Sequence, residues 1–209
     1  MGTKRVGLAR MEALMENLKR DLDLQSTTLT AAKHAGLTVD GGTGAGLAGT
    51  GTAPSQSILT IEDQIITTIK IDLAGLKKES DEGDVIGLAS GGAAYLMIYN
   101  PNTHGVFHKI EISCVELPTG TNVLKDFDII SCDEINLAQA GDAAGATNPV
   151  SITAMAGNIA LGQTYQDLTA GQPNASGDAL YLCEGATSTN AQLYTAGMLI
   201  IRFYGSRTF

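Results

Sequence analysis

Apolar residues near the start of the chain recur every three or four positions, which places them in one stripe along a helix. The stripe consists of Leu8, Met11, Leu14, Met15, Leu18 and Leu22. It predicts an amphipathic helical arm within residues 1–35. Such a stripe has to be covered, because each Leu or Met removed from water contributes about 1.5 to 3 kcal/mol. The cover is the rest of this chain, a second copy of the helix or another protein.

A glycine-rich segment follows the predicted helix. Seven glycines fall between Gly36 and Gly51, with few side chains that could pack. Ordering such a segment costs about 1 to 2 kcal/mol per residue, with little apolar burial in return unless another surface supplies contacts. We therefore expect residues 36–56 to form a linker or extended arm that lets the helix dock away from the body.

Residues 57–209 contain short β-branched runs separated by turn residues, which is typical of an all-β domain. Alternation is clearest in residues 68–73 and 109–114, where every second residue is apolar. No helical pattern of crossover length separates the runs, so the strands should be antiparallel. The fold class predicted is mainly β, with a helical arm, a linker and a β-sandwich or jelly-roll-like body. The expected strands cover residues 58–61, 65–73, 85–89, 94–99, 106–117, 127–131, 150–154, 180–183 and 198–204.

Charge narrows the choice of partner. The 209 residues include 13 Lys and Arg against 22 Asp and Glu, a net charge of −9, which disfavours binding to nucleic acid through its phosphates. No apolar run reaches the roughly 20 residues that a membrane helix needs, so no membrane partner is expected. Between Lys125 and Arg202 there are eight acidic residues and no basic ones. We expect an anionic surface there, either for solubility or because it faces solvent in a crowded assembly.

Known cofactor and metal motifs do not fit their usual context. Gly44–Gly49 matches G-x-G-x-x-G, but no convincing strand precedes it and Thr50–Pro54 cannot start the required helix. His104 and His108 flank a glycine, and two ligands do not complete a zinc site. We expect these histidines at the surface or at strand ends, and neither a cofactor nor a metal.

The three cysteines lie singly, in or beside apolar strands. Cys114, Cys132 and Cys183 form no C-x-x-C pair, so we expect buried thiols in a reducing compartment. A nucleophilic Cys114 acting with His108 would lack the third member of a catalytic set. The sequence therefore predicts no catalytic residue and a protein that is not an enzyme.

Four segments carry a resemblance to a known group of proteins. They are Ile66–Leu73, Gly91–Tyr95, Ile200–Gly205, and the opening Lys4–Arg10 together with Leu14, Glu16, Leu18, Lys19, Arg20 and Leu22. These segments resemble small structural proteins of tailed bacteriophages, notably phages of marine bacteria. The resemblance implies a virion component, and head decoration or cement proteins of that kind are often trimeric β-rich bodies. It supplies no functional residues to carry over.

The leading hypothesis is a capsid decoration protein. It would be made in the bacterial host cytoplasm, bind the outside of the phage head and bridge subunits of the major capsid protein through the stripe. Many identical copies would make weak contacts cumulative. A homo-oligomer is expected, with a trimer favoured. The alternative is a trimeric head or tail fibre protein, in which the stripe forms a stem and loops of the body bind a host receptor or glycan.

Overall fold

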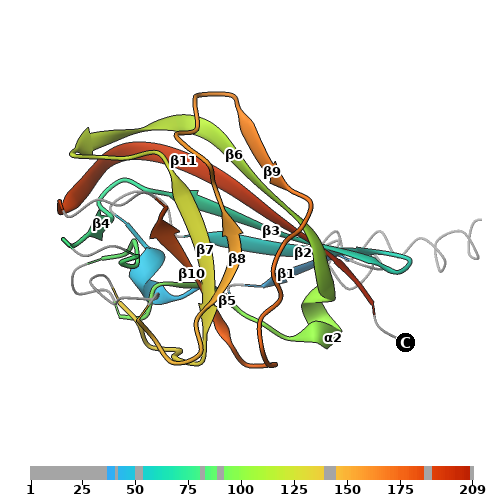
Figure 1. Cartoon of the computed structure of the whole chain (residues 1–209). Coiled ribbons are helices and arrows are strands. Elements are labelled where there is room, and N and C mark those ends of the chain that lie inside the picture. The colour runs from blue at the N-terminus through green and yellow to red at the C-terminus, as the bar shows by residue number, and fades with distance from the viewer. Residues whose placement is uncertain are drawn as a thin grey trace, which may run out of the picture. The chain divides into compact units, whose positions relative to one another are not determined.

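The computed structural model describes residues 37–40, 42–49, 54–80, 83–88, 92–138, 145–185 and 190–207. The chain divides into two units, Met1–Ala35 and Gly36–Phe209, and every described residue belongs to the second. The predicted helix within residues 1–35 lies outside the described residues. Strands make up 52% of the described residues, and the helices among them are only two short turns, η2 (Ala45–Leu47) and α2 (Pro101–His104). The fold is therefore mainly β (Figure 1).

The larger of two sheets is antiparallel and has the strand order β1-β2-β3-β11-β6-β9, with β4 paired to one end of β11. Its two longest strands, β11 and β6, pair with each other, and Figure 1 shows them running side by side. The bounds of the strands are β1 Leu37–Asp40, β2 Ser55–Ile61, β3 Gln64–Asp72, β4 Lys77–Lys78, β6 Val106–Thr121, β9 Thr164–Asp167 and β11 Gln192–Ser206.

The smaller sheet has four antiparallel strands in the order β5-β10-β7-β8. The bounds are β5 Tyr95–Ile98, β7 Phe127–Cys132, β8 Val150–Ala154 and β10 Ala179–Glu184. All six residues of β10 are buried. Both faces of this strand are therefore covered, which explains its nearly continuous apolar sequence.

Side chains from both sheets belong to one hydrophobic core. In β3, Ile69 and Ile71 are fully buried and the residues on either side of them are not, which confirms the predicted alternation. In β6, Ile110 and Ile112 are buried in the same way. Glu111 between them is also buried, at 8% exposure, because polar neighbours surround its carboxylate as described below.

Part of the predicted linker belongs to this body. Residues Leu37–Asp40 form β1 and pair with β2, and the Gly46 N–H donates to the Ala93 carbonyl at 2.8 Å. Leu47 is fully buried in the core. The prediction of a free linker over residues 36–56 is therefore wrong for these described residues. The glycines permit close backbone contact, since a Cβ on Gly46 would lie 2.3 Å from a carbonyl oxygen of a neighbouring segment.

Residues 85–89 were expected to form a strand, but their described part makes only single bridges. Val85 pairs with Cys183, and Gly87 pairs with Lys77. Val85 and Ile86 are both fully buried. Their apolar character therefore reflects packing into the core rather than membership of a strand ladder.

Strand β6 does not end at residue 117 as expected but continues through Pro118 and Gly120 to Thr121. A proline fits into this strand because the partner strand β11 is irregular here, with register shifts between Ala196 and Met198. Gly197, with φ +137°, lies opposite, and a Cβ on it would be 2.8 Å from the Pro118 Cα. The bulge therefore lets the strand continue through Pro118.

Candidate functional site

The predicted assembly stripe lies outside the described residues. Leu8, Met11, Leu14, Met15, Leu18 and Leu22 all fall within Met1–Ala35. Their role as a contact stays a prediction. The described residues add a surface patch, an open cleft and two sets of polar contacts that the sequence pattern does not reveal.

An apolar patch lies on the outer face of the larger sheet, where the β2–β3 hairpin ends. Leu59 pairs with Ile66 and Ile66 with Tyr204, so these three side chains share one face. Ile61 and Val106 lie at the next positions on that face. Leu59 is 37% exposed, Ile61 54% and Val106 37%. We call these five residues the hairpin patch.

A polar network adjoins the hairpin patch. The Glu111 carboxylate accepts hydrogen bonds from Gln166 Nε2 at 2.8 Å and from the Tyr204 hydroxyl at 2.7 Å, and pairs with Lys109 at 2.7 Å. Arg202 is 3.8 Å away, and Lys109 lies 4.6 Å from the centre of the Tyr204 ring. Burial raises the pKa of Glu111. The hydrogen bonds and the positive charges together lower it by more, so the net pKa lies below its ordinary value. The network fixes the rim of the hairpin patch.

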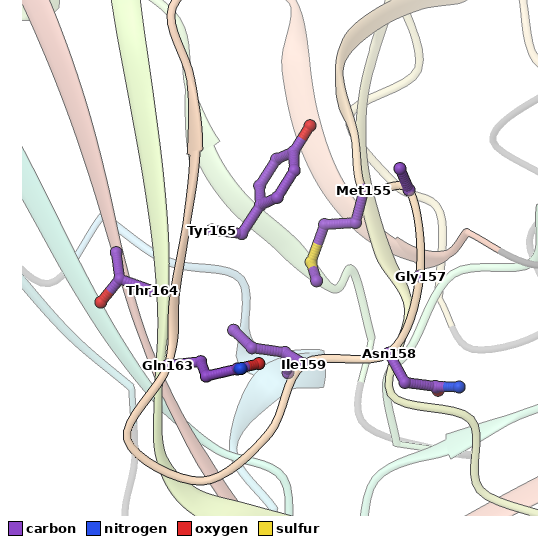
Figure 2. A pocket seen from close by; sticks show the side chains of 8 residues that line it. Met155, Gly157, Asn158, Ile159, Gln163, Thr164 and Tyr165 are labelled. Carbon is purple, nitrogen blue, oxygen red and sulfur yellow. The ribbon is translucent and has the colours of Figure 1, made fainter.

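An open cleft of about 470 Å³ lies in the loop between β8 and β9. Figure 2 shows Met155 and Tyr165 on opposite sides of it, with Ile159 at its base. The polar side chains here are engaged in holding the loop. Asn158 Oδ1 accepts from the Lys125 N–H at 2.8 Å, and the Tyr165 hydroxyl donates to a backbone carbonyl at 2.7 Å. The cleft therefore presents an apolar floor with few uncommitted polar groups.

The carboxylates expected to form an anionic surface are only partly exposed. Eight acidic residues fall between positions 126 and 201, and Asp142 lies outside the described residues. Asp126, Asp178 and Glu184 are buried. The prediction of an anionic surface built from all eight is therefore wrong for these three.

Several of these carboxylates hold loops by accepting backbone hydrogen bonds. Asp128 Oδ1 accepts from the Met155 N–H at 3.0 Å, and Glu134 accepts from the Thr147 N–H at 2.8 Å. Asp178 accepts from a backbone N–H at 3.0 Å. Backbone donors thus take the place of the lysines and arginines that this region lacks.

Two of these carboxyl groups titrate above the usual range. Burial raises the pKa of Asp128 to about 6, against the lowering effect of its hydrogen bond from Met155, and the nearby charge of Asp126 raises it further. Burial also raises the pKa of Asp126, against a hydrogen bond from the Gly157 backbone. The two groups share one poorly solvated region, so both are harder to ionise than free aspartate.

The histidines and cysteines are not assembled into a site. His104 is buried in α2, two residues before β6 begins, and its Nδ1 accepts from the Asn100 N–H at 3.0 Å, so of the two expected positions the surface one is wrong for this residue. His108 is exposed, as expected. Cys114 lies six residues along β6 from His108, about 20 Å away in an extended strand. The structure therefore does not bring the possible Cys–His pair together.

All three cysteines are buried thiols, which confirms the prediction of buried thiols. Burial raises the pKa of the Cys132 thiol to about 11 and raises the pKa of Cys114 as well. Thiols with raised pKa values carry little thiolate at neutral pH and are weak nucleophiles. Among the described residues, no group of three or more His, Cys, Asp or Glu side chains could hold a metal ion.

A buried polar cluster joins the two sheets and was not foreseen. Its members are Lys78 on β4, Glu184 on β10, and Gln192 and Tyr194 on β11, each 3% exposed or less. The sequence feature that could have predicted this cluster is the position of Glu184 at the end of an apolar strand. Gln192 likewise opens the mainly apolar β11.

Comparison with known proteins gave no relative. No family model, curated protein or solved structure matches the chain. In the part of the chain that the structure describes, no helix is long and apolar enough to cross a membrane.

Proposed function

We propose that this protein is a non-enzymatic decoration protein of a phage head. It binds the outside of the shell, bridges subunits of the major capsid protein and assembles as a homotrimer. In this proposal the two antiparallel sheets form a β-sandwich body, and residues 1–35 form the helical arm. Its location is the virion.

One observation carries the proposal: an exposed apolar patch lies beside β1, the first strand of the body. Leu37, the first residue of β1, pairs with Leu59 of the hairpin patch. The first strand of the body therefore runs beside Leu59. In this proposal one partner covers both the stripe and the hairpin patch.

The energy available at the hairpin patch is modest for one copy. Complete burial of a Leu or Ile side chain contributes about 1.5 to 3 kcal/mol, and the exposed portions of Leu59 and Ile61 represent roughly half of that. Repetition over a symmetric shell and within a trimer multiplies such contacts through avidity. A decoration protein is the kind of protein for which weak, repeated apolar contacts suffice.

The test is binding of the full chain to shells assembled from the major capsid protein of the phage that encodes it. We expect the wild-type protein to co-sediment with shells in numbers comparable to the capsid subunits. Ile61→Asp should weaken binding by about tenfold or more, because it places a charge in an apolar contact. Leu14→Asp with Leu18→Asp should abolish binding.

The matched control is Leu193→Asp. Leu193 is 37% exposed on β11 and lies eleven positions from Tyr204, about 37 Å along an extended strand and away from the hairpin patch. This variant should bind shells like the wild type. If the full chain does not bind shells, or if a virion carries only the few copies expected of a fibre, the proposal is wrong. Equal loss of binding for Ile61→Asp and Leu193→Asp would show that the hairpin patch is not part of the contact.

A further inference from the structure

The buried polar cluster brings an amine and a carboxamide to one carboxylate. Lys78 Nζ lies 2.7 Å from Glu184 Oε2, and both side chains are fully buried. Gln192 Nε2 donates to Glu184 Oε1 at 2.7 Å. Among the described residues Oε2 has no hydrogen-bond partner besides this ammonium contact. The carboxylate therefore bridges the two groups, one on each of its oxygens.

The backbone places the same two residues side by side. Lys78 on β4 and Gln192 on β11 are direct antiparallel partners. Side chains of such partners leave the sheet on the same face, with Cβ atoms about 5 Å apart. Both side chains are thus held on one side of the sheet, toward Glu184 on β10 of the other sheet.

The amide orientation follows from its neighbours. A carboxylate only accepts hydrogen bonds, so Gln192 must present its NH₂ group to Glu184. Its Oε1 then faces Tyr194, whose hydroxyl donates to it at 3.0 Å. Burial raises the pKa of Tyr194, and the charge of Glu184 raises it further, so this hydroxyl keeps its proton. The amide carbonyl therefore has a permanent donor aimed at its oxygen.

We propose that Lys78 and Gln192 join through an intramolecular isopeptide bond, with Glu184 as the proton-transfer group and Tyr194 as the donor to the developing oxyanion. Nothing in this inference depends on the proposed role at a phage head. It assigns a covalent self-modification to the interior of the body.

The reaction balances without a co-reactant. The Lys78 ammonium gives a proton to Glu184 Oε2, and the neutral amine attacks Cδ of Gln192. The Nζ–Cδ bond forms while the carbonyl electrons move to Oε1, where Tyr194 donates its hydrogen bond. Glu184 passes its proton to Nε2 and takes one from Nζ. The Cδ–Nε2 bond then breaks, ammonia leaves, and Glu184 remains protonated.

The environment favours each step. The 2.7 Å contact between Nζ and Oε2 gives a direct path for the proton that the amine must lose before it attacks. Holding the amine and the carboxamide on one carboxylate replaces a collision between two molecules by an intramolecular step. Exclusion of water also protects the amide from hydrolysis. The product ties the two-residue strand β4 to β11.

The decisive measurement is the intact mass of the purified full-length protein under denaturing conditions. We expect a mass lower than that of the sequence by one ammonia. Protease digestion should yield one branched peptide that joins the segments containing Lys78 and Gln192. A wild-type protein that keeps its full mass after prolonged incubation overturns the proposal.

Variants separate this bond from other losses of ammonia. Lys78→Arg preserves the charge but cannot form the bond, so it should keep its full mass. If Lys78→Arg also loses ammonia, the loss arises elsewhere and the proposal fails. Glu184→Gln should keep its full mass too, with folding checked by circular dichroism.

Tyr194→Phe removes only the oxyanion donor and keeps the aromatic ring. It should fold and form the bond about a hundredfold more slowly, as expected for loss of one such donor. The rate is read from masses taken at intervals after refolding. An unchanged rate in Tyr194→Phe would remove Tyr194 from the mechanism, and a wild-type branched peptide at another lysine would overturn the assignment of Lys78.

Discussion

Replacing Leu47 tests whether the glycine-rich segment is part of the folded body. Leu47 lies in η2, is fully buried and belongs to the hydrophobic core. Backbone hydrogen bonds from Gly44 to Tyr95 and from Gly46 to Ala93, both of 2.8 Å, hold it there. The sequence pattern alone does not show what Leu47 packs against. Its burial therefore distinguishes a segment that packs against the body from a free linker.

The magnitude follows from the burial of the side chain. Leu47→Ala removes a fully buried side chain and leaves a cavity, which lowers the free energy of unfolding by about 2 to 5 kcal/mol. For a domain of this size each kcal/mol moves the midpoint by about 2 to 4 °C, so a loss near 3 kcal/mol lowers it by about 6 to 12 °C. A solvent-exposed leucine in a linker would change stability by less than about 0.5 kcal/mol.

The assay is thermal unfolding followed by circular dichroism, with a neighbouring position as control. Ala45 is the exposed first residue of η2, and Ala45→Ser adds one heavy atom at the surface. This variant should unfold like the wild type. A shift below about 2 °C for Leu47→Ala would refute the packing of this segment against the body.

Three further predictions concern polar side chains. Asp128→Asn should raise stability at pH 7.5, because the variant lacks a carboxyl group that is costly to ionise in the folded protein. Burial raises the native pKa of Asp128 to about 6, so the native state binds this proton more tightly than the unfolded state does. Wild-type stability should therefore rise as pH falls from about 7 to about 4. Melting temperatures across this range check both effects, and an unchanged slope in the variant would contradict the assignment. Gln172→Ala removes the acceptor of the Phe107 N–H and the donor to the Phe107 carbonyl. We expect the free energy of unfolding to fall by about 1 to 3 kcal/mol in urea titrations. An unchanged urea midpoint would contradict this expectation. Burial and the hydrogen bond to Glu111 raise the pKa of Tyr204 to about 12, so Glu111→Gln should lower this pKa. The shift is measured from phenolate absorbance during alkaline titration, with Tyr204→Phe as the blank.

The sequence alone predicts those strands that have one apolar face and one polar face. The alternation in residues 64–72 locates β3 and its inward side chains, because one face meets the core and the other meets solvent. The edge strand β9 has no such contrast. Its four residues are half-buried or exposed and mostly polar, so only pairing with β6 makes it a strand.

Contacts between distant segments account for what the pattern misses. Glycines in residues 42–49 indicate a linker when taken locally, yet they permit close approach of the backbone to residues 92–95. Lys78 is likewise typical of a solvent-exposed residue in its own sequence neighbourhood. It is buried only because Glu184, more than a hundred residues later, lies 2.7 Å from its amine. Long-range pairing of this kind leaves no trace in a window of a few residues.

The proposed shell contact and the proposed covalent bond lie at opposite ends of one strand. Gln192 opens β11 beside Lys78, and Tyr204 near its other end belongs to the hairpin patch. Twelve residues separate them, about 40 Å along an extended strand. Substitutions at such a distance with no shared partners are expected to have additive effects. Glu184→Gln should therefore leave shell binding intact and Ile61→Asp should leave the bond intact. A covalent bond between β4 and β11 would join these two strands at the end of the sheet opposite the proposed shell contact.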